Sequence, residues 1–182
     1  VLAALAARSP HDVVVVDGHG PVTAAALAAR VDDCATTLAG LPAGAVASRL
    51  DNGADWIALD LALQATGRAH IALPPFFTDA QAAHAVAPAV ALVVPGDGGT
   101  GAGQRLRYLP APALAAAIPS GTRAVTYTSG STGAPKGVCL DGGLLDAVAQ
   151  SLATAMAPLA VRRHLCLLPL GVLLEAVGGV YA

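Results

Sequence analysis

The sequence predicts an α/β protein built on a layered, mostly parallel β-sheet with helices on both faces. Short runs rich in Val, Ile and Leu alternate along the chain with longer segments of helical spacing, an order typical of parallel sheets whose crossovers are helices. Some of those runs, such as 13–16 and 90–94, are apolar at every position, as expected for strands buried on both faces. Apolar residues supply 55% of the chain and charged residues 12%, which suffices for a core and is too apolar for a disordered chain.

Strands are expected at the short runs of β-branched and apolar residues, which occupy 13–16, 46–50, 70–73, 90–94, 122–128 and 165–168. Turn residues follow several of these runs, such as Asp17 and Gly18 after the first. Helices are expected at 23–38, 56–66, 78–86 and 144–157, with the end of another at 1–8 and the start of one at 173–177.

The expected helix at 23–38 shows the pattern on which these assignments depend. Thr23 is suited to cap its start, and Gly40 is suited to end it. Apolar residues at steps of four, three and four form one face, namely Leu27, Val31, Cys34 and Leu38. Thr78 and Gln81 have the spacing of a capping box at the start of another helix.

The stretch at about 95–121 has neither the strand pattern nor the helix pattern. Glycines crowd its first part, and Pro110, Pro112 and Pro119 interrupt the second. Because the alternation of strand and helix resumes after it, this stretch predicts a surface loop within one domain and not a domain boundary.

Charge and hydropathy argue against several kinds of partner. The net charge is -2 and no basic patch is visible, so nothing favours a nucleic acid or an anionic membrane surface. The most apolar run, 165–174, is about half the length of a spanning helix and contains Pro169, so no transmembrane segment is expected. Cys34, Cys139 and Cys166 have no metal-ligand spacing, and we expect buried, reduced thiols of a cytoplasmic protein.

The stretch 127–138, Tyr-Thr-Ser-Gly-Ser-Thr-Gly-Ala-Pro-Lys-Gly-Val, holds the residues best suited to bind a ligand. It extends an expected strand and contains Lys136, the only lysine in the sequence. Glycines let a backbone approach a ligand closely, while hydroxyls, backbone N–H groups and a lysine charge suit an oligophosphate. It is not a Walker A loop, because Gly137 stands where Ser or Thr is required, and its glycines lack the Rossmann spacing.

Residues 128–137 closely resemble the signature of the adenylate-forming superfamily, which includes acyl- and aryl-CoA synthetases, adenylation domains of nonribosomal peptide synthetases, and luciferases. Weaker similarity covers three further segments, 52–63, 72–75 and 167–181. The last of these is similar to the Pro-Leu-x-His-x-x-Glu region of long-chain acyl-CoA synthetases, with Val172 at the usual histidine position. All the matches fall in the N-terminal half of the family's large domain. The resemblance therefore identifies 1–182 as part of an AMP-binding domain, without the rest of that domain and without the small lid domain.

The resemblance also implies roles for individual residues. The loop would cradle the β- and γ-phosphates of ATP, with Lys136 as the catalytic cation and Thr128 as a contact of Mg²⁺. Hydroxyl donors and backbone positions complete the implied ATP-binding set, which comprises Ser129, Gly130, Ser131, Thr132, Gly133, Pro135 and Gly137. Pro135 would stiffen the turn, and the glycines would let the backbone come close to the phosphates.

The reaction implied by the family has two steps. A carboxylate attacks the α-phosphate of ATP to give an acyl adenylate, and a thiol of coenzyme A or of phosphopantetheine on an acyl carrier protein then takes the acyl group. The region 173–181 favours a fatty or other aliphatic acid, with an aryl-CoA ligase or an amino-acid adenylation domain as the alternative. The family's later motifs are missing, so we expect this chain alone to be inactive and its parent to be a cytoplasmic acid–thiol ligase of fatty acid metabolism.

Two other classes of function stay open at this point. The chain could be a non-catalytic remnant or half-domain that binds a partner, or it could be a generic nucleotide-binding module. Downstream Tyr-Gly-x-Thr-Glu and Thr-Gly-Asp motifs would support the enzyme, whereas a stop codon directly after Ala182 would support the remnant.

The polar residues outside the loop give weaker signals. Glu175 lies in an apolar stretch, where it either acts near the site, faces solvent or caps the last helix. His164 follows two arginines, which predicts a solvated turn. The other histidines have no metal spacing, and no Ser/His/Asp constellation can be argued from the spacings; these histidines are His11, His19, His70 and His84.

Overall fold

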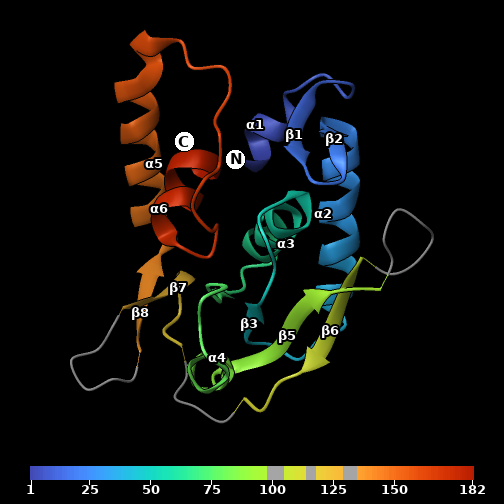
Figure 1. Cartoon of the computed structure of the whole chain (residues 1–182), viewed down its shortest axis with the longest axis vertical. Coiled ribbons are helices and arrows are strands. Elements are labelled where there is room, and N and C mark those ends of the chain that lie inside the picture. Colours follow the sequence, from blue (N-terminus) through green and yellow to red (C-terminus); the bar gives the residue numbers. More distant parts are fainter. Residues whose placement is uncertain (98–104, 114–117, 129–134) are drawn as a thin grey trace.

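The computed structural model describes residues 1–97, 105–113, 118–128 and 135–182. Within them, a six-stranded sheet has the order β6-β5-β3-β4-β7-β8 (Figure 1). Its central strands run parallel, namely β3 (Ala45–Ser48), β4 (His70–Ala72), β5 (Ala89–Pro95) and β7 (Thr122–Thr128). Antiparallel strands form both edges, β6 (Leu106–Pro110) beside β5 and β8 (Lys136–Asp141) beside β7. The predicted α/β class with a mostly parallel sheet is confirmed.

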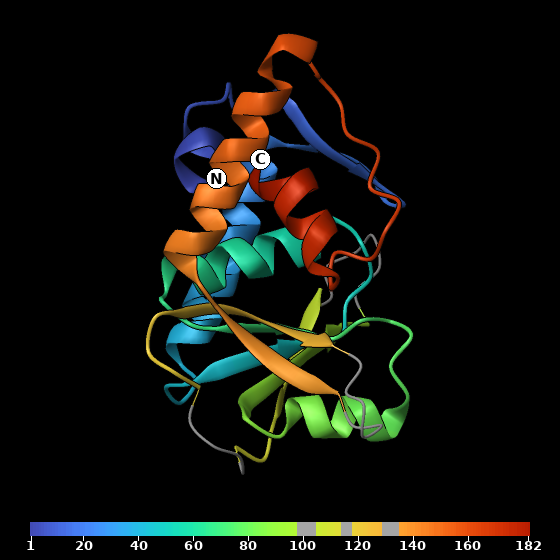
Figure 2. The same cartoon turned by 90° about the vertical axis from the view of Figure 1, so that its left-hand side faces the viewer.

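Helices cover both faces of this sheet, as the sequence predicts. Helices α2 (Ala24–Ala39) and α3 (Ala54–Ala65) lie on one face, and α4 (Asp79–Val86) lies on the other (Figure 2). Successive residues of a strand point to opposite faces. In β3, Val46 packs in the core cluster of α2 and α3, whereas Ala45 and Ala47 pack in the cluster that includes α4. Burial on both sides explains why this strand is apolar at consecutive positions.

The predicted helix signals are confirmed where they are strongest. Thr23 caps α2 by accepting a hydrogen bond from the Ala26 N–H at 3.2 Å. The predicted apolar face of α2 is buried along its whole length. At α4, both hydrogen bonds of the Thr78 and Gln81 capping box are present. Gly67 follows α3 with φ +66°, a backbone conformation that glycine adopts without strain.

A small antiparallel hairpin precedes α2 and includes a strand that the sequence did not reveal. Helix α1 (Leu2–Ala6) leads to β1 (Val13–Asp17), which pairs with β2 (Gly20–Thr23). The second strand was missed because it is short and contains Pro21. Asp17 joins this hairpin to the core, since its Oδ2 accepts a hydrogen bond from the Ala54 N–H at 3.0 Å, at the start of α3.

Two edge strands correct the sequence-based description. Strand β6 lies inside the stretch 95–121, which was predicted to be a loop throughout, and its Tyr108 pairs with Val93 of β5. An edge strand pairs on one side only, so the proline at its end is tolerated. Strand β8 lies between the loop and helix α5 (Gly142–Met156), where the sequence predicted none. It is almost wholly exposed, and its apolar run, Val138 to Leu140, is shorter than the runs by which strands are recognised.

The strand predicted at 165–168 is absent, and this prediction was wrong. The segment is extended but pairs with no strand in the part of the chain that the structure describes. Leu165 and Leu167 are 75% and 77% exposed. An apolar run predicts burial, but a strand also needs a neighbour with free backbone groups.

The chain ends in α6 (Leu173–Glu175), which continues as a π-helical turn at Ala176–Tyr181 packed against α5 (Figure 1). The prediction that all three cysteines are buried holds for Cys34 but is wrong for Cys139, which is exposed on β8. Among the described residues, no helix is both long enough and apolar enough to cross a membrane.

Candidate functional site

The hairpin of β7 and β8 frames the predicted phosphate loop. In its register, Thr128 is the partner of Lys136; Figure 1 shows β7 beside β8. The two residues therefore stand side by side at the two ends of the loop, and both are exposed. This pairing places a strand, β8, between the loop and the helix that the sequence predicted at 144–157. The predicted site residues Ser129, Gly130, Ser131, Thr132 and Gly133 lie outside the described residues.

Gly137 has a packing role in the hairpin. It pairs with Tyr127, and an added Cβ would lie 3.2 Å from the Tyr127 ring and 3.2 Å from a methyl of Val125. Both distances are tighter than ordinary van der Waals contact. The glycine at this position therefore lets the Tyr127 ring lie across β8.

Helix α4 supports the base of the hairpin. The Tyr127 hydroxyl donates a hydrogen bond to the Ala85 carbonyl at 3.0 Å, and its ring packs edge-on against Phe77 with centroids 5.9 Å apart. Burial raises the pKa of Tyr127, so the phenol stays a donor. His84 Nε2 lies 3.1 Å from the carbonyl of Pro135, a buried residue directly before Lys136. The sequence indicated no role for His84, because only the fold brings α4 to Pro135.

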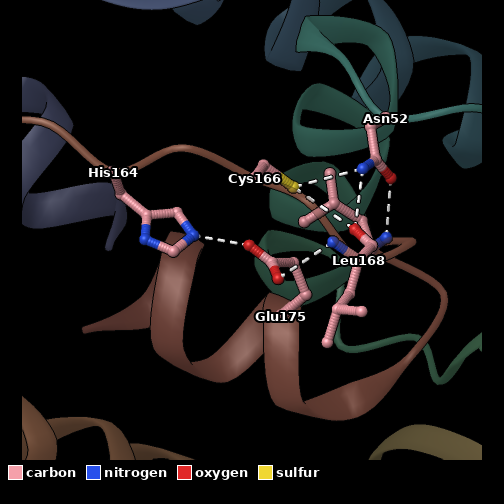
Figure 3. A network of polar contacts seen from close by, with 6 residues as sticks. Asn52, His164, Cys166, Leu168 and Glu175 are labelled. Atoms are coloured by element: carbon pink, nitrogen blue, oxygen red, sulfur yellow. Dashed lines mark hydrogen bonds and ion pairs between the residues drawn. The ribbon is translucent and has the colours of Figure 1, made fainter.

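A second polar cluster lies around Glu175 (Figure 3). Glu175 is 7% exposed; Oε1 bonds His164 Nε2, and Oε2 accepts from the Leu168 N–H at 3.2 Å. The His164 hydrogen bond, with the Leu168 N–H, holds the pKa of Glu175 below its ordinary value despite burial. The alternatives of a solvent-facing or capping Glu175 are therefore wrong. His164 is not in a purely solvated turn, because it is paired with this carboxylate.

Asn52 ties the same cluster to the start of α3. Its amide donates to the Leu168 carbonyl at 2.8 Å and contacts Cys166 Sγ at 3.2 Å, while its Oδ1 accepts from the Leu170 N–H at 2.7 Å (Figure 3). Burial, with Glu175 nearby, raises the pKa of Cys166 to about 11. A thiol with such a pKa is protonated near neutral pH and is a poor nucleophile. The cluster therefore fixes the path of the chain before α6.

Similarity to this chain was found among solved structures only. No protein-family model matches the sequence, and no curated protein matches it. Solved structures do match. The amide bond synthetase McbA from Marinactinospora thermotolerans has a TM-score of 0.70 and 30% identity, over 94% of this chain and 40% of that one. The chain belongs to the adenylate-forming superfamily.

Two further structures show the same fold. The O-succinylbenzoate coenzyme A synthetase MenE from Bacillus subtilis, in complex with AMP, has a TM-score of 0.70 and 19% identity, over 99% of this chain and 52% of that one. ATP-bound MatB from Rhodopseudomonas palustris has a TM-score of 0.70 and 20% identity, over 97% of this chain and 41% of that one. The chain therefore spans about half or less of the length of these adenylate-forming proteins, and it corresponds to their N-terminal part.

The described end of the loop fits the oligophosphate that an adenylate-forming protein needs to bind. Lys136 supplies a cation and Thr128 a hydroxyl at the same level of the hairpin, both open to solvent. In the described part of the chain, no group of three or more His, Cys, Asp or Glu residues could hold a metal ion. The Thr128 hydroxyl could give Mg²⁺ one oxygen ligand, the others being phosphate oxygens and water, as is usual for this ion.

The structure also assembles a Ser/His/Asp constellation that the sequence spacing could not reveal. Ser48 Oγ lies 2.8 Å from His70 Nε2, and His70 Nδ1 lies 2.8 Å from Asp60 Oδ1. All three residues are at most 2% exposed, so no substrate can reach the serine. The other Asp60 oxygen accepts bonds from Gln64 and from the Tyr181 hydroxyl, at 2.7 and 2.8 Å. In this adenylate-forming fold the constellation is a structural network that joins β3, β4, α3 and the last turn.

Proposed function

We propose that the parent protein of this chain activates a carboxylic acid with ATP and transfers the acyl group to a thiol. The observation that carries the proposal is the register pair of Thr128 and Lys136, which places a hydroxyl and the chain's single lysine at the two ends of a Ser/Thr/Gly stretch. Support comes from the MenE and MatB structures, which hold AMP and ATP respectively.

In the first step, a carboxylate oxygen of the acid attacks the α-phosphorus of ATP. The bond to the β-phosphate breaks, and pyrophosphate leaves. Lys136 would form an ion pair with the β- and γ-phosphates. The Thr128 hydroxyl would donate a hydrogen bond to a phosphate oxygen or bind the metal. Magnesium, when bound, would neutralise further phosphate charge. In the second step, the thiol of coenzyme A or of a carrier protein's phosphopantetheine attacks the acyl carbon, and AMP leaves.

For the substrate, we propose a fatty or other aliphatic acid, handled by a cytoplasmic ligase. The Leu173 to Tyr181 segment supports this choice by its resemblance to long-chain acyl-CoA synthetases. An aryl or amino acid is the alternative, and the similarity to MenE, an O-succinylbenzoate coenzyme A synthetase, gives the aryl alternative some support.

Acid-dependent exchange of labelled pyrophosphate into ATP tests the proposal in the complete protein. A panel of aliphatic, aromatic and amino acids should give exchange with one class. Lys136→Ala should lower the exchange rate by about 10²–10³-fold, because a positioned charge donor is lost, whereas Lys136→Arg keeps the charge and should lose less. Absence of exchange with every acid in the panel would overturn the proposal. The 182-residue chain alone should show no exchange.

A second candidate function is that of a half-domain that binds a partner. It is favoured by large apolar side chains that are mostly exposed at the C-terminal third, including Leu159 (72%), Leu165 (75%), Leu167 (77%) and Leu174 (69%). Such side chains are usually covered when they are this numerous. Sedimentation of the isolated chain, together with the reading frame beyond residue 182, distinguishes this candidate from an enzyme whose own later residues cover the same face.

A further inference from the structure

Helix α4 offers the phosphate loop a fixed support. Its start is held by the reciprocal hydrogen bonds of the capping box, at 3.3 Å to Thr78 Oγ1 and 3.0 Å to Gln81 Oε1. Its inner face, Ala82 and Ala85, is buried in the same core cluster as Val125 of β7. The helix is therefore anchored both at its end and along its length, and a group on it is a stable reference point for the hairpin.

Two neighbouring residues of α4 contact the hairpin on either side of the loop. Ala85 accepts the Tyr127 hydroxyl before the loop, and His84 reaches the Pro135 carbonyl after it. A carbonyl oxygen only accepts hydrogen bonds, so His84 Nε2 must carry the proton and donate it. Pro135 is itself buried, so this carbonyl has a well-defined place.

We propose that His84 is a positioning residue for Lys136. The Pro135 carbonyl and the Lys136 nitrogen belong to one planar peptide unit, so a hydrogen bond that holds the carbonyl also fixes the Cα of the lysine. The ladder with Thr128 holds the same residue from the opposite side. Together, the two contacts set the point from which the lysine side chain extends. The inference rests on the proposed function, because Lys136 needs a fixed origin only if it binds phosphates.

A matched pair of variants tests this role. His84→Leu removes the donor, and His84→Gln restores an N–H donor at a similar reach. Because His84 is on the exposed side of α4, both variants should unfold at the same temperature as the unaltered chain. Without ATP, amide hydrogens at 136–138 should exchange several-fold faster in His84→Leu and at the normal rate in His84→Gln.

Kinetics of the complete protein supply the second readout. His84→Leu should raise KM for ATP about five- to tenfold, the equivalent of one hydrogen bond, with kcat nearly unchanged. His84→Gln should bring KM back to within about twofold of the original value. Unchanged exchange and unchanged KM in His84→Leu, or no rescue by His84→Gln, would overturn the positioning role. If Lys136→Ala binds ATP normally, the proposed function itself fails, which is a different result from a failure of His84 alone.

Discussion

Asp60–His70 and Glu175–His164 are two carboxylate–imidazole pairs in very different surroundings. In the first pair both side chains are sealed, 3% and 2% exposed, between α3 and the sheet. In the second the Glu175 side chain is 8% exposed but the His164 side chain is 47% exposed, beside the extended segment that leads to α6 (Figure 3). The same type of pair is therefore buried in the core in one region and partly exposed in the C-terminal region.

The two pairs differ in how fully the described residues surround them. Asp60 accepts hydrogen bonds on both oxygens from three different parts of the chain, and Trp56 packs on His70 with ring centroids 5.2 Å apart. Around Glu175, by contrast, neighbouring leucines remain exposed. A buried charged group depends entirely on its partner, because no water can take the partner's place. At an exposed charged group, water can replace the partner.

The largest expected effect is that of His70→Ala. It leaves the Asp60 carboxylate buried without its imidazole partner, which should lower the free energy of unfolding by about 3–5 kcal/mol. Urea unfolding followed by circular dichroism measures the change. The matched variant His164→Ala should cost much less, because water reaches that imidazole. Equal losses in the two variants would erase the proposed distinction between the pairs.

Glu175→Gln should have an intermediate effect of about 2 kcal/mol, since it replaces a charge-assisted hydrogen bond by a neutral one. The pKa of Glu175 is lowered in the fold, so its stabilisation is fully present above the pKa of an unfolded glutamate. It is lost as the pH falls through the lower, folded pKa. Unfolding measured between pH 7 and pH 3 should therefore show a smaller acid-induced loss in Glu175→Gln than in the unaltered chain. Parallel pH profiles would contradict this.

The smallest expected effect is that of Tyr181→Phe, which removes only the hydroxyl bound to Asp60. Gln64 and His70 remain on the carboxylate, so the cost should be about 1 kcal/mol. The ring also lies under the Arg123 guanidinium, 4.5 Å from its centroid, and the phenylalanine ring keeps that contact. If Tyr181→Phe lowered the free energy of unfolding as much as His70→Ala does, the Asp60–His70 pair would depend on the last turn as strongly as on the imidazole.

Local patterns predicted the parts of this fold that depend on local forces. The caps of α2 and α4 and the two-sided burial of β3 are set by nearby residues, and their positions were recovered from the sequence. Strand β8 and the missing strand at 165–168 depend instead on whether a neighbouring strand is present. That information is not contained in the segments themselves.

The candidate site shows the same division. The residue types at Thr128 and Lys136 indicated phosphate chemistry, but their face-to-face register follows from the hairpin. The contacts of His84 with Pro135 and of His164 with Glu175 join residues 51 and 11 positions apart. In neither pair do both residues lie in the same helix or strand, so only the folded chain brings the partners together.

The hydrogen bond between Tyr181 and Asp60 spans 121 positions, which has a consequence for the order of folding during synthesis. His70 and Ser48 lie within 22 positions of their partners, so the inner part of the network can close while the chain is still emerging from the ribosome. The Tyr181 hydroxyl reaches Asp60 only after the phosphate loop and α5 have been made. Long-range contacts form late because the intervening chain must first be ordered. Among the contacts of this network, the bond between Tyr181 and Asp60 should therefore be the last to form.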